Sequence, residues 1–197
     1  MSRRSAVGSS QSAVGPILIG FLFILGAAVL VAQGQVETRL ETGFGAELLT
    51  DLSRLEQKLI GLAEAVPQEE FGWRPAEGVR SLGEVYIHQA VSNHRILEAV
   101  GVSVPENIEQ MEEITDKEEV ISSLKHSIEA LRQAVLATPG DGLDDPVEFF
   151  GRSWSKRAIF YLAATHMHEH LCQSIAYARS IGVVPPWSQQ LSPEEGE

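Results

Sequence analysis

The chain has 197 residues, of which 44% are hydrophobic and 21% charged, so its composition is that of a globular protein and excludes a disordered one. Its 27 acidic and 15 basic residues give a net charge of −12, and no cluster of Lys or Arg follows the N-terminal segment. Such a chain repels phosphate backbones, so we expect no nucleic-acid partner. Cys172 is the only cysteine, which excludes an intramolecular disulfide.

The N-terminal segment has the pattern of an export signal. Arg3 and Arg4 precede a stretch without charge that lasts until Glu37, and residues 17–32 at its centre are almost purely apolar. A basic start followed by an apolar run predicts a secretory signal peptide over residues 1–34. The run is also long enough to remain as a transmembrane anchor, which needs roughly 20 residues. Under either interpretation, we expect the domain to be periplasmic or extracellular, or anchored in the membrane on its outer side.

Downstream of this segment, apolar residues recur at steps of three and four in four places, which is the pattern of amphipathic helices. The recurring residues of the first are Leu48, Leu52, Leu55, Leu59, Leu62 and Val66. Pro67 ends this predicted helix. The second helix is predicted over residues 81–101, because Ser81 and Glu84 form the capping-box pattern with which helices begin.

The third helix is predicted to begin at a second capping box, formed by Thr115 and Glu118. The fourth is predicted over residues 155–181, because Gly182 follows it and can terminate a helix. Between them, residues 142–153 predict an irregular connection, and no segment predicts a β-meander.

Four amphipathic helices of this length predict an all-α domain in the form of a four-helix bundle. We place this domain at residues 45–188. The N-terminal signal or anchor helix over residues 1–34 precedes it, and residues 189–197 form an acidic tail that we expect to be disordered.

Three histidines fall on helix faces that the periodicity assigns to the interior. His166 and His170 are one turn apart on the fourth helix, and His88 belongs to the inward series of the second. Imidazoles buried without partners lose hydration free energy, and a divalent cation bound by all three removes that loss. Three nitrogen ligands also leave coordination positions open for water or substrate. The alternative is that the histidines are ordinary hydrogen-bonded core residues.

Some residues near the three histidines are candidates to support a metal site, and others are expected to have no part in it. Gln173, one turn after His170, is a candidate to orient an imidazole or a bound water. Glu84, one turn before His88, is a candidate acid or base, although its capping role already explains it. The remaining histidines are His94, His126 and His168, which are expected at the surface, while Cys172 is expected to pack rather than to reach the metal.

Several segments together resemble the DinB-like family of four-helix-bundle metalloproteins. They are the Trp-Arg-Pro loop at residues 73–75, His88 on the second helix and the pair His166 and His170 on the fourth. The resemblance covers residues 49–188, with Cys172 where a glycine is common. It implies an up-up-down-down bundle that binds zinc, nickel or another divalent ion, with iron and manganese not distinguished, through those three histidines. Some relatives are thiol transferases, which implies a metal-bound thiolate nucleophile.

Three functions follow as hypotheses. The first is an exported or membrane-tethered metal-dependent enzyme, a thiol transferase or a hydrolase, acting on a small molecule. The second is a non-catalytic metal-binding module, and the third is an envelope interaction protein whose histidines are only hydrogen-bonded. A homodimer is compatible with each of these hypotheses. The sequence supplies no catalytic residue and no organic cofactor site.

Overall fold

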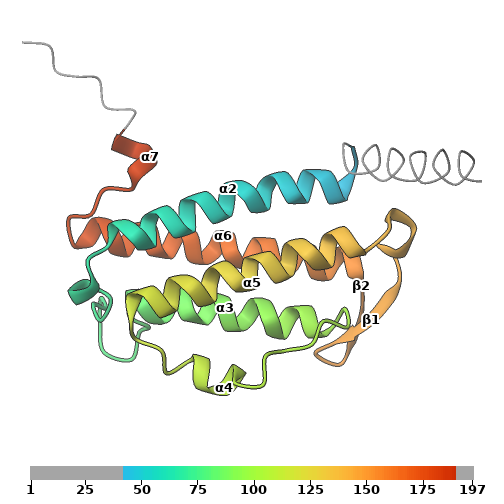
Figure 1. Ribbon diagram of the computed structural model, residues 1–197, viewed down its shortest axis with the longest axis horizontal. Coiled ribbons are helices and arrows are strands. Elements are labelled where there is room, and N and C mark those ends of the chain that lie inside the picture. Colours follow the sequence, from blue (N-terminus) through green and yellow to red (C-terminus); the bar gives the residue numbers. More distant parts are fainter. Residues whose placement is uncertain (1–41, 190–197) are drawn as a thin grey trace, which may run out of the picture. The chain divides into compact units, whose positions relative to one another are not determined.

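The structure is a computed structural model that describes residues 42–189 (Figure 1). The signal or anchor predicted over residues 1–34, and nearly all of the predicted tail, lie outside the described residues. The elements are α2 (Phe44–Ala65), η1 (Gln68–Glu70), α3 (Leu82–Glu98), α4 (Ile108–Met111), α5 (Lys117–Ala137), η2 (Gly140–Gly142), β1 (Pro146–Phe149), β2 (Arg152–Ser155), α6 (Lys156–Ser180) and α7 (Pro186–Gln189). Between residues 42 and 189, no helix is both long and apolar enough to cross a membrane. The described part is mainly helical, as predicted, with one small sheet.

The capping box predicted at the start of α3 is present. Ser81 Oγ accepts a hydrogen bond from the backbone N–H of Glu84 at 3.2 Å, and Glu84 Oε2 accepts one from the N–H of Ser81 at 2.7 Å. These two bonds satisfy donors that the first turn of a helix otherwise leaves unpaired. They fix the direction in which α3 leaves its preceding loop.

The predicted start of α5 is wrong by one residue. The N-cap is Asp116, whose Oδ1 accepts from the N–H of Glu119 at 3.1 Å, and not Thr115 with Glu118. A carboxylate at this position both pairs with the free N–H groups and interacts favourably with the positive end of the helix dipole. The Thr115–Glu118 and Asp116–Glu119 patterns overlap in the sequence, and the cap formed by Asp116 determines where α5 begins.

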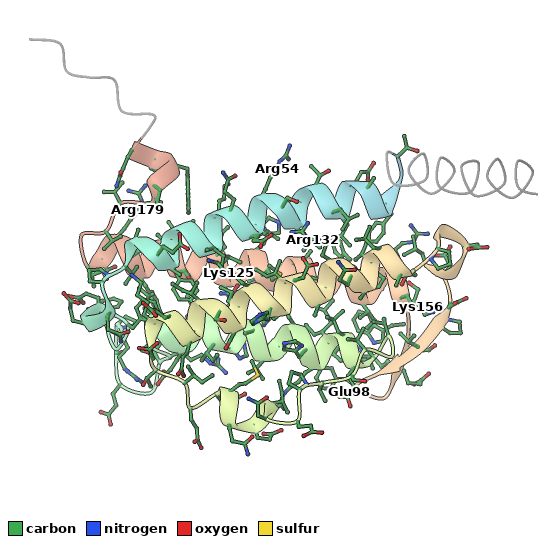
Figure 2. The ribbon with its side chains drawn as sticks, in the orientation of Figure 1. Arg54, Glu98, Lys125, Arg132, Lys156 and Arg179 are labelled. Carbon is green, nitrogen blue, oxygen red and sulfur yellow. The ribbon has the colours of Figure 1, made fainter. Side chains whose placement is uncertain are left out.

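The four long helices pack around one apolar core. Helix α3 contacts α5 and α6, and α2 contacts the same two helices (Figure 1). The largest fully buried side chains of this core are Tyr86, Phe160, Leu52, Leu55, Leu59, Leu62, Leu82, Ile87, Leu97, Leu124, Ile128 and Leu131. At its border, Arg132 of α5 forms an ion pair with Glu56 of α2 (Figure 2). Burial of these leucines, at about 1.5–3 kcal/mol each, is the main source of stability.

The path of the chain differs from the up-up-down-down order that the family resemblance implied. Figure 1 shows α2 and α3 running antiparallel, α3 and α5 running in the same direction, and α6 running opposite to α5. Helix α6 packs against α2 and α3. The reversal between α2 and α3 occurs in the loop 66–81. The parallel step from α3 to α5 uses the longer crossover 99–116, which contains α4. The parallel step therefore falls in the middle of the chain path, between two reversals.

The loop 66–81 is held closely against the start of α3. The backbone N–H of Leu82 donates to Trp73 O at 2.9 Å, and that of Gly83 donates to Phe71 O at 2.8 Å. A Cβ atom added at Gly83 would lie 3.0 Å from Phe71 Cδ1 and 3.1 Å from its carbonyl oxygen. A side chain at this position would force Phe71 to shift, so glycine favours this close approach. The contact places Trp73 next to the helices that carry the histidines.

The irregular connection predicted over residues 142–153 contains a β-hairpin, which corrects that prediction. Strands β1 and β2 pair antiparallel, with Val147 opposite Trp154. Phe150 and Gly151 form the two-residue turn and both have positive φ, 48° and 69°. This is the backbone of a tight hairpin turn, which usually carries Asn-Gly or Asp-Gly. The phenylalanine in the first turn position hides the hairpin from sequence inspection.

Candidate metal centre

The three predicted histidines converge on one point between two helices. His88 comes from α3, and His166 and His170 come from α6; one ligand nitrogen from each lies within 4.8 Å of the other two. The ring centroids are 4.4 Å apart for His166 and His170, 4.9 Å for His88 and His170, and 5.3 Å for His88 and His166. All three side chains are half-buried. This cluster is the only such group of metal-binding side chains among residues 42–189.

Gln173 holds neutral His170 in one tautomer. His170 Nδ1 lies 2.8 Å from Gln173 Oε1, and because a carbonyl oxygen can only accept, Nδ1 is the donor. The lone pair of neutral His170 is therefore on Nε2. That atom faces His166 Nε2 at a distance of 3.1 Å. Gln173 thus has the position predicted for a residue that orients an imidazole.

The hydrogen bonding of His166 is incomplete, whichever nitrogen carries its proton. Its Nδ1 is buried and has no hydrogen-bond partner among the described residues. If Nδ1 carries the proton, a buried donor has no acceptor and two Nε2 lone pairs face each other. If Nε2 carries it, Nδ1 is a buried acceptor without a donor. Each arrangement is unfavourable by roughly 1–3 kcal/mol.

A divalent cation fits this donor set. Two nitrogens bound at about 2.0–2.1 Å to a tetrahedral zinc are roughly 3.3 Å apart, close to the 3.1 Å between the Nε2 atoms of His166 and His170. Imidazole is a common ligand of zinc, copper, iron and nickel. Three protein ligands are also the number found in catalytic sites, which keep a position for water or substrate. His88, His166 and His170 are therefore the residues that would hold a metal ion.

The surroundings keep His88 and His166 neutral, which is the form that binds metal. Burial, together with the charges of Arg80, His170 and His166, lowers the pKa of His88 to about 4. Burial also lowers the pKa of His166, helped by His170 and Arg80 and opposed by Glu169. At neutral pH both side chains therefore offer a lone pair without first losing a proton.

A chain of contacts supports His170 from the far side. Gln173 Nε2 donates to Tyr177 Oη at 2.9 Å, and the Tyr177 ring packs edge-on against Trp73 with centroids 5.5 Å apart. Trp73 belongs to the loop 66–81, whose hydrogen bonds to the start of α3 are described above. The loop therefore reaches the metal-binding face through Tyr177 and Gln173.

Glu84 lies near His88 but has both carboxylate oxygens occupied. Oε2 accepts from the N–H of Ser81, and Oε1 accepts from Arg74 Nη2 at 2.8 Å. The hydrogen bond from Ser81, and then Arg74, lower the pKa of Glu84 against the opposing effect of burial. The carboxylate is therefore a weak base held in place by its cap. This geometry favours the capping interpretation over an acid–base role.

Two further residues adjoin the histidines and were not singled out from the sequence. Ser92 Oγ lies 3.5 Å from both ring nitrogens of His88, and its position one turn later on α3 was the available signal. Arg80, which precedes the capping box, lines a depression of about 200 Å³ with Glu84 and His88. Nothing in the helical periodicity marks Arg80, because it lies in a loop.

The other histidines do not join the cluster. His168 is exposed and its Nε2 lies 2.8 Å from Asp51 Oδ2, and His126 is exposed as well, as predicted. His94, predicted at the surface, is buried and only 8% exposed, because α3 has neighbours on most of its circumference. Cys172, predicted to pack, is exposed.

Comparison with known proteins identifies relatives of this fold. The family model of the DinB superfamily matches residues 51–174. The chain is similar to a crystal structure of a DinB-like protein from Bacillus cereus ATCC 10987, with a TM-score of 0.62, 18% identity, and coverage of 71% of this chain and 93% of that one. A DinB-like protein from Bacillus subtilis gives a TM-score of 0.48 and 19% identity, covering 69% and 92%. Among curated proteins, none matches. The chain belongs to the DinB superfamily.

Proposed function

We propose that the protein binds one divalent metal ion through His88, His166 and His170 and acts as a metal-dependent transferase or hydrolase. One observation carries the proposal. Imidazole nitrogens from two different helices lie within 4.8 Å of one another in a domain whose core is mainly apolar. The family to which the chain belongs supports it. Zinc, nickel, iron and manganese bind nitrogen ligands to different degrees, and three histidines alone do not select one of these ions.

The residues of the chain have distinct roles in this proposal. Gln173 holds the His170 ring with Nε2 directed at the site, and burial keeps His88 and His166 unprotonated. A divalent ion bound there supplies Lewis acidity and lowers the pKa of a coordinated water or thiol. Arg80, at the edge of the site, adds positive charge that favours an anionic ligand of either kind.

A second candidate is a non-catalytic metal-binding module. The contacts of Glu84 favour this non-catalytic role. Its carboxylate, one helical turn before His88, already accepts hydrogen bonds from Arg74 and Ser81, so it is not a free general base. In this case the ion would link α3 to α6 and stabilise the four-helix bundle without turnover.

We also propose that the domain is exported or membrane-tethered. The support is the sequence of the first 34 residues, with Arg3 and Arg4 ahead of an apolar run. Fusion of alkaline phosphatase to the C-terminus tests this, since that reporter is active only outside the cytoplasm. High phosphatase activity supports export, and activity no greater than that of a fusion lacking residues 1–34 contradicts it.

Metal analysis of the purified protein tests the central part of the proposal. We expect about one divalent ion per wild-type chain and a loss of most of that metal in His88→Ala. His126→Ala is the matched control, because His126 is an exposed histidine outside the cluster, and it should retain the metal. Equal metal content in His88→Ala and wild type would refute the ligand assignment. Turnover of thiol and ester substrates by the loaded protein then distinguishes enzyme from binding module.

A further inference from the structure

A cleft of about 810 Å³ reaches the histidine cluster at His166. His166 and Ser92 line its inner end, and Ser92 also touches His88. The cleft runs from there along α3 toward the β1–β2 hairpin. A volume of this size suits a small organic molecule, since ligand sites typically measure about 300–1,000 Å³.

The walls of the cleft are mainly apolar and come from four separate parts of the fold. Besides Phe150, the apolar lining residues are Ile96, Ala99, Val104, Ile108, Phe149 and Leu162. They belong to α3, the crossover with α4, the hairpin and α6. An ion pair between Arg95 and Glu109, with Nη2 to Oε1 at 3.0 Å, ties the crossover to α3. The body of a molecule seated here is therefore recognised by apolar contact.

The outer rim of the cleft carries unbalanced negative charge. Arg95 and Glu109 neutralise each other across it. Glu98, at the end of α3 (Figure 2), and Glu148, on β1, also line the cleft and have no ion-pair partner among residues 42–189. Two free carboxylates from different elements attract a cation and repel an anion at the mouth.

An aromatic ring adds to this preference. Phe150 lines the same cleft, is 88% exposed, and lies with its ring centroid 4.4 Å from that of Phe149. Its φ of 48° is unfavourable for a residue with a Cβ atom, and such strain concentrates at sites of function. The face of an exposed aromatic ring attracts cations, so Phe150 and the two glutamates favour the same kind of ligand.

We propose that this cleft is the substrate site and that it binds organic cations with an apolar body, such as alkyl- or arylalkyl-ammonium compounds. The ammonium group lies at the rim near Glu98, Glu148 and Phe150, the apolar body lies between α3 and α6, and the opposite end of the molecule reaches His166. The inference rests on the proposed function, since it names the substrate class of the same histidine site.

Calorimetric titration of the full chain, purified in detergent, tests the inference. The probes are (4-phenylbutyl)trimethylammonium, whose quaternary nitrogen cannot bind a metal, and the neutral 4-phenylbutanol. Each is titrated into zinc-loaded and into chelator-treated protein. We expect the cation to bind about tenfold more tightly than the alcohol in both forms at low ionic strength, as two exposed charge pairs would produce.

The variants separate charge from shape. The double variant Glu98→Gln/Glu148→Gln should bind the cation no more tightly than the alcohol. Glu69→Gln, which removes an exposed charge outside the cleft, should leave the affinity for both probes unchanged. Phe150→Ala should weaken binding of the cation several-fold. Leu136→Ala, which removes another exposed apolar side chain, should leave that binding unchanged. Circular dichroism confirms that each variant is folded.

The outcomes keep the two proposals apart. Equal binding of both probes by wild type, or an unchanged cation preference in the double glutamine variant, overturns the substrate class even if zinc is bound at the histidines. A cation preference in a protein that binds no zinc supports the cleft assignment and refutes the proposed metal function.

Discussion

Nδ1 of His170 donates a hydrogen bond to Oε1 of Gln173 at 2.8 Å, so one glutamine determines which nitrogen of that ring is free. We expect Gln173→Ala to weaken zinc binding about 10- to 100-fold, as loss of a partner that orients a ligand does elsewhere. A competition titration with a chromophoric chelator measures this. Gln133→Ala on α5, where Gln133 is exposed and bonds only to Glu129, is the control and should bind zinc as wild type does. Unchanged affinity in Gln173→Ala would remove Gln173 from the site.

Metal removal should lower thermal stability. An ion that binds only the folded state stabilises it by about 2.7 kcal/mol at a free concentration one hundred times Kd. For a domain of this size that corresponds to roughly 5–10 °C in Tm. Differential scanning calorimetry with and without chelator should show this shift in wild type. The shift should disappear in His166→Ala, and a shift of the same size in that variant would place the stabilising ion elsewhere.

The metal-free protein should lose stability as the pH falls from about 6.5 toward 4. The folded-state pKa of His88 is about 4, below the ordinary value of about 6.5 that applies to the unfolded chain. Between these values the unfolded state binds more protons, so the free energy of unfolding increases with pH. His166 acts in the same direction. Urea unfolding at several pH values should show a steeper dependence in wild type than in His88→Asn, and parallel curves would contradict the assignment.

The hairpin turn should tolerate, and benefit from, asparagine in place of phenylalanine. Phe150 has a φ of 48° and is 88% exposed, so it loses little burial when replaced. Asn accepts this backbone conformation more readily, and we expect Phe150→Asn to raise the free energy of unfolding by about 0.5–1 kcal/mol. Gly151→Ala, at a φ of 69°, should lower it. Urea titration measures both, and destabilisation by Phe150→Asn would mean that its contact with Phe149 outweighs the strain.

The helices were predictable because their leucines repeat at helical spacing and their ends carry capping residues. Leu52, Leu55 and Leu59 are almost completely buried, as that spacing requires. The histidine cluster was predictable for the same reason, since His88, His166 and His170 occupy inward positions on their helices. Such positions follow from local geometry, which the sequence encodes directly.

Other features were not predictable because they depend on contacts between distant segments. His94 is buried although its place on the helix wheel indicated the surface, because the neighbours of α3 cover more of it than one face. The hairpin was hidden by an unusual turn residue, Phe150. The cleft beside His166 forms only when the crossover and the hairpin meet α3 and α6, and no single segment contains its pattern.

Anomalous X-ray diffraction from crystals of the zinc-loaded protein, collected at the zinc edge, tests the central claim most directly. We predict one strong anomalous peak within bonding distance of a ring nitrogen of each of His88, His166 and His170, with the Nδ1 of His170 still bonded to Gln173. A peak bound to other side chains, or three histidines that remain in contact with one another and bind no ion, would contradict it.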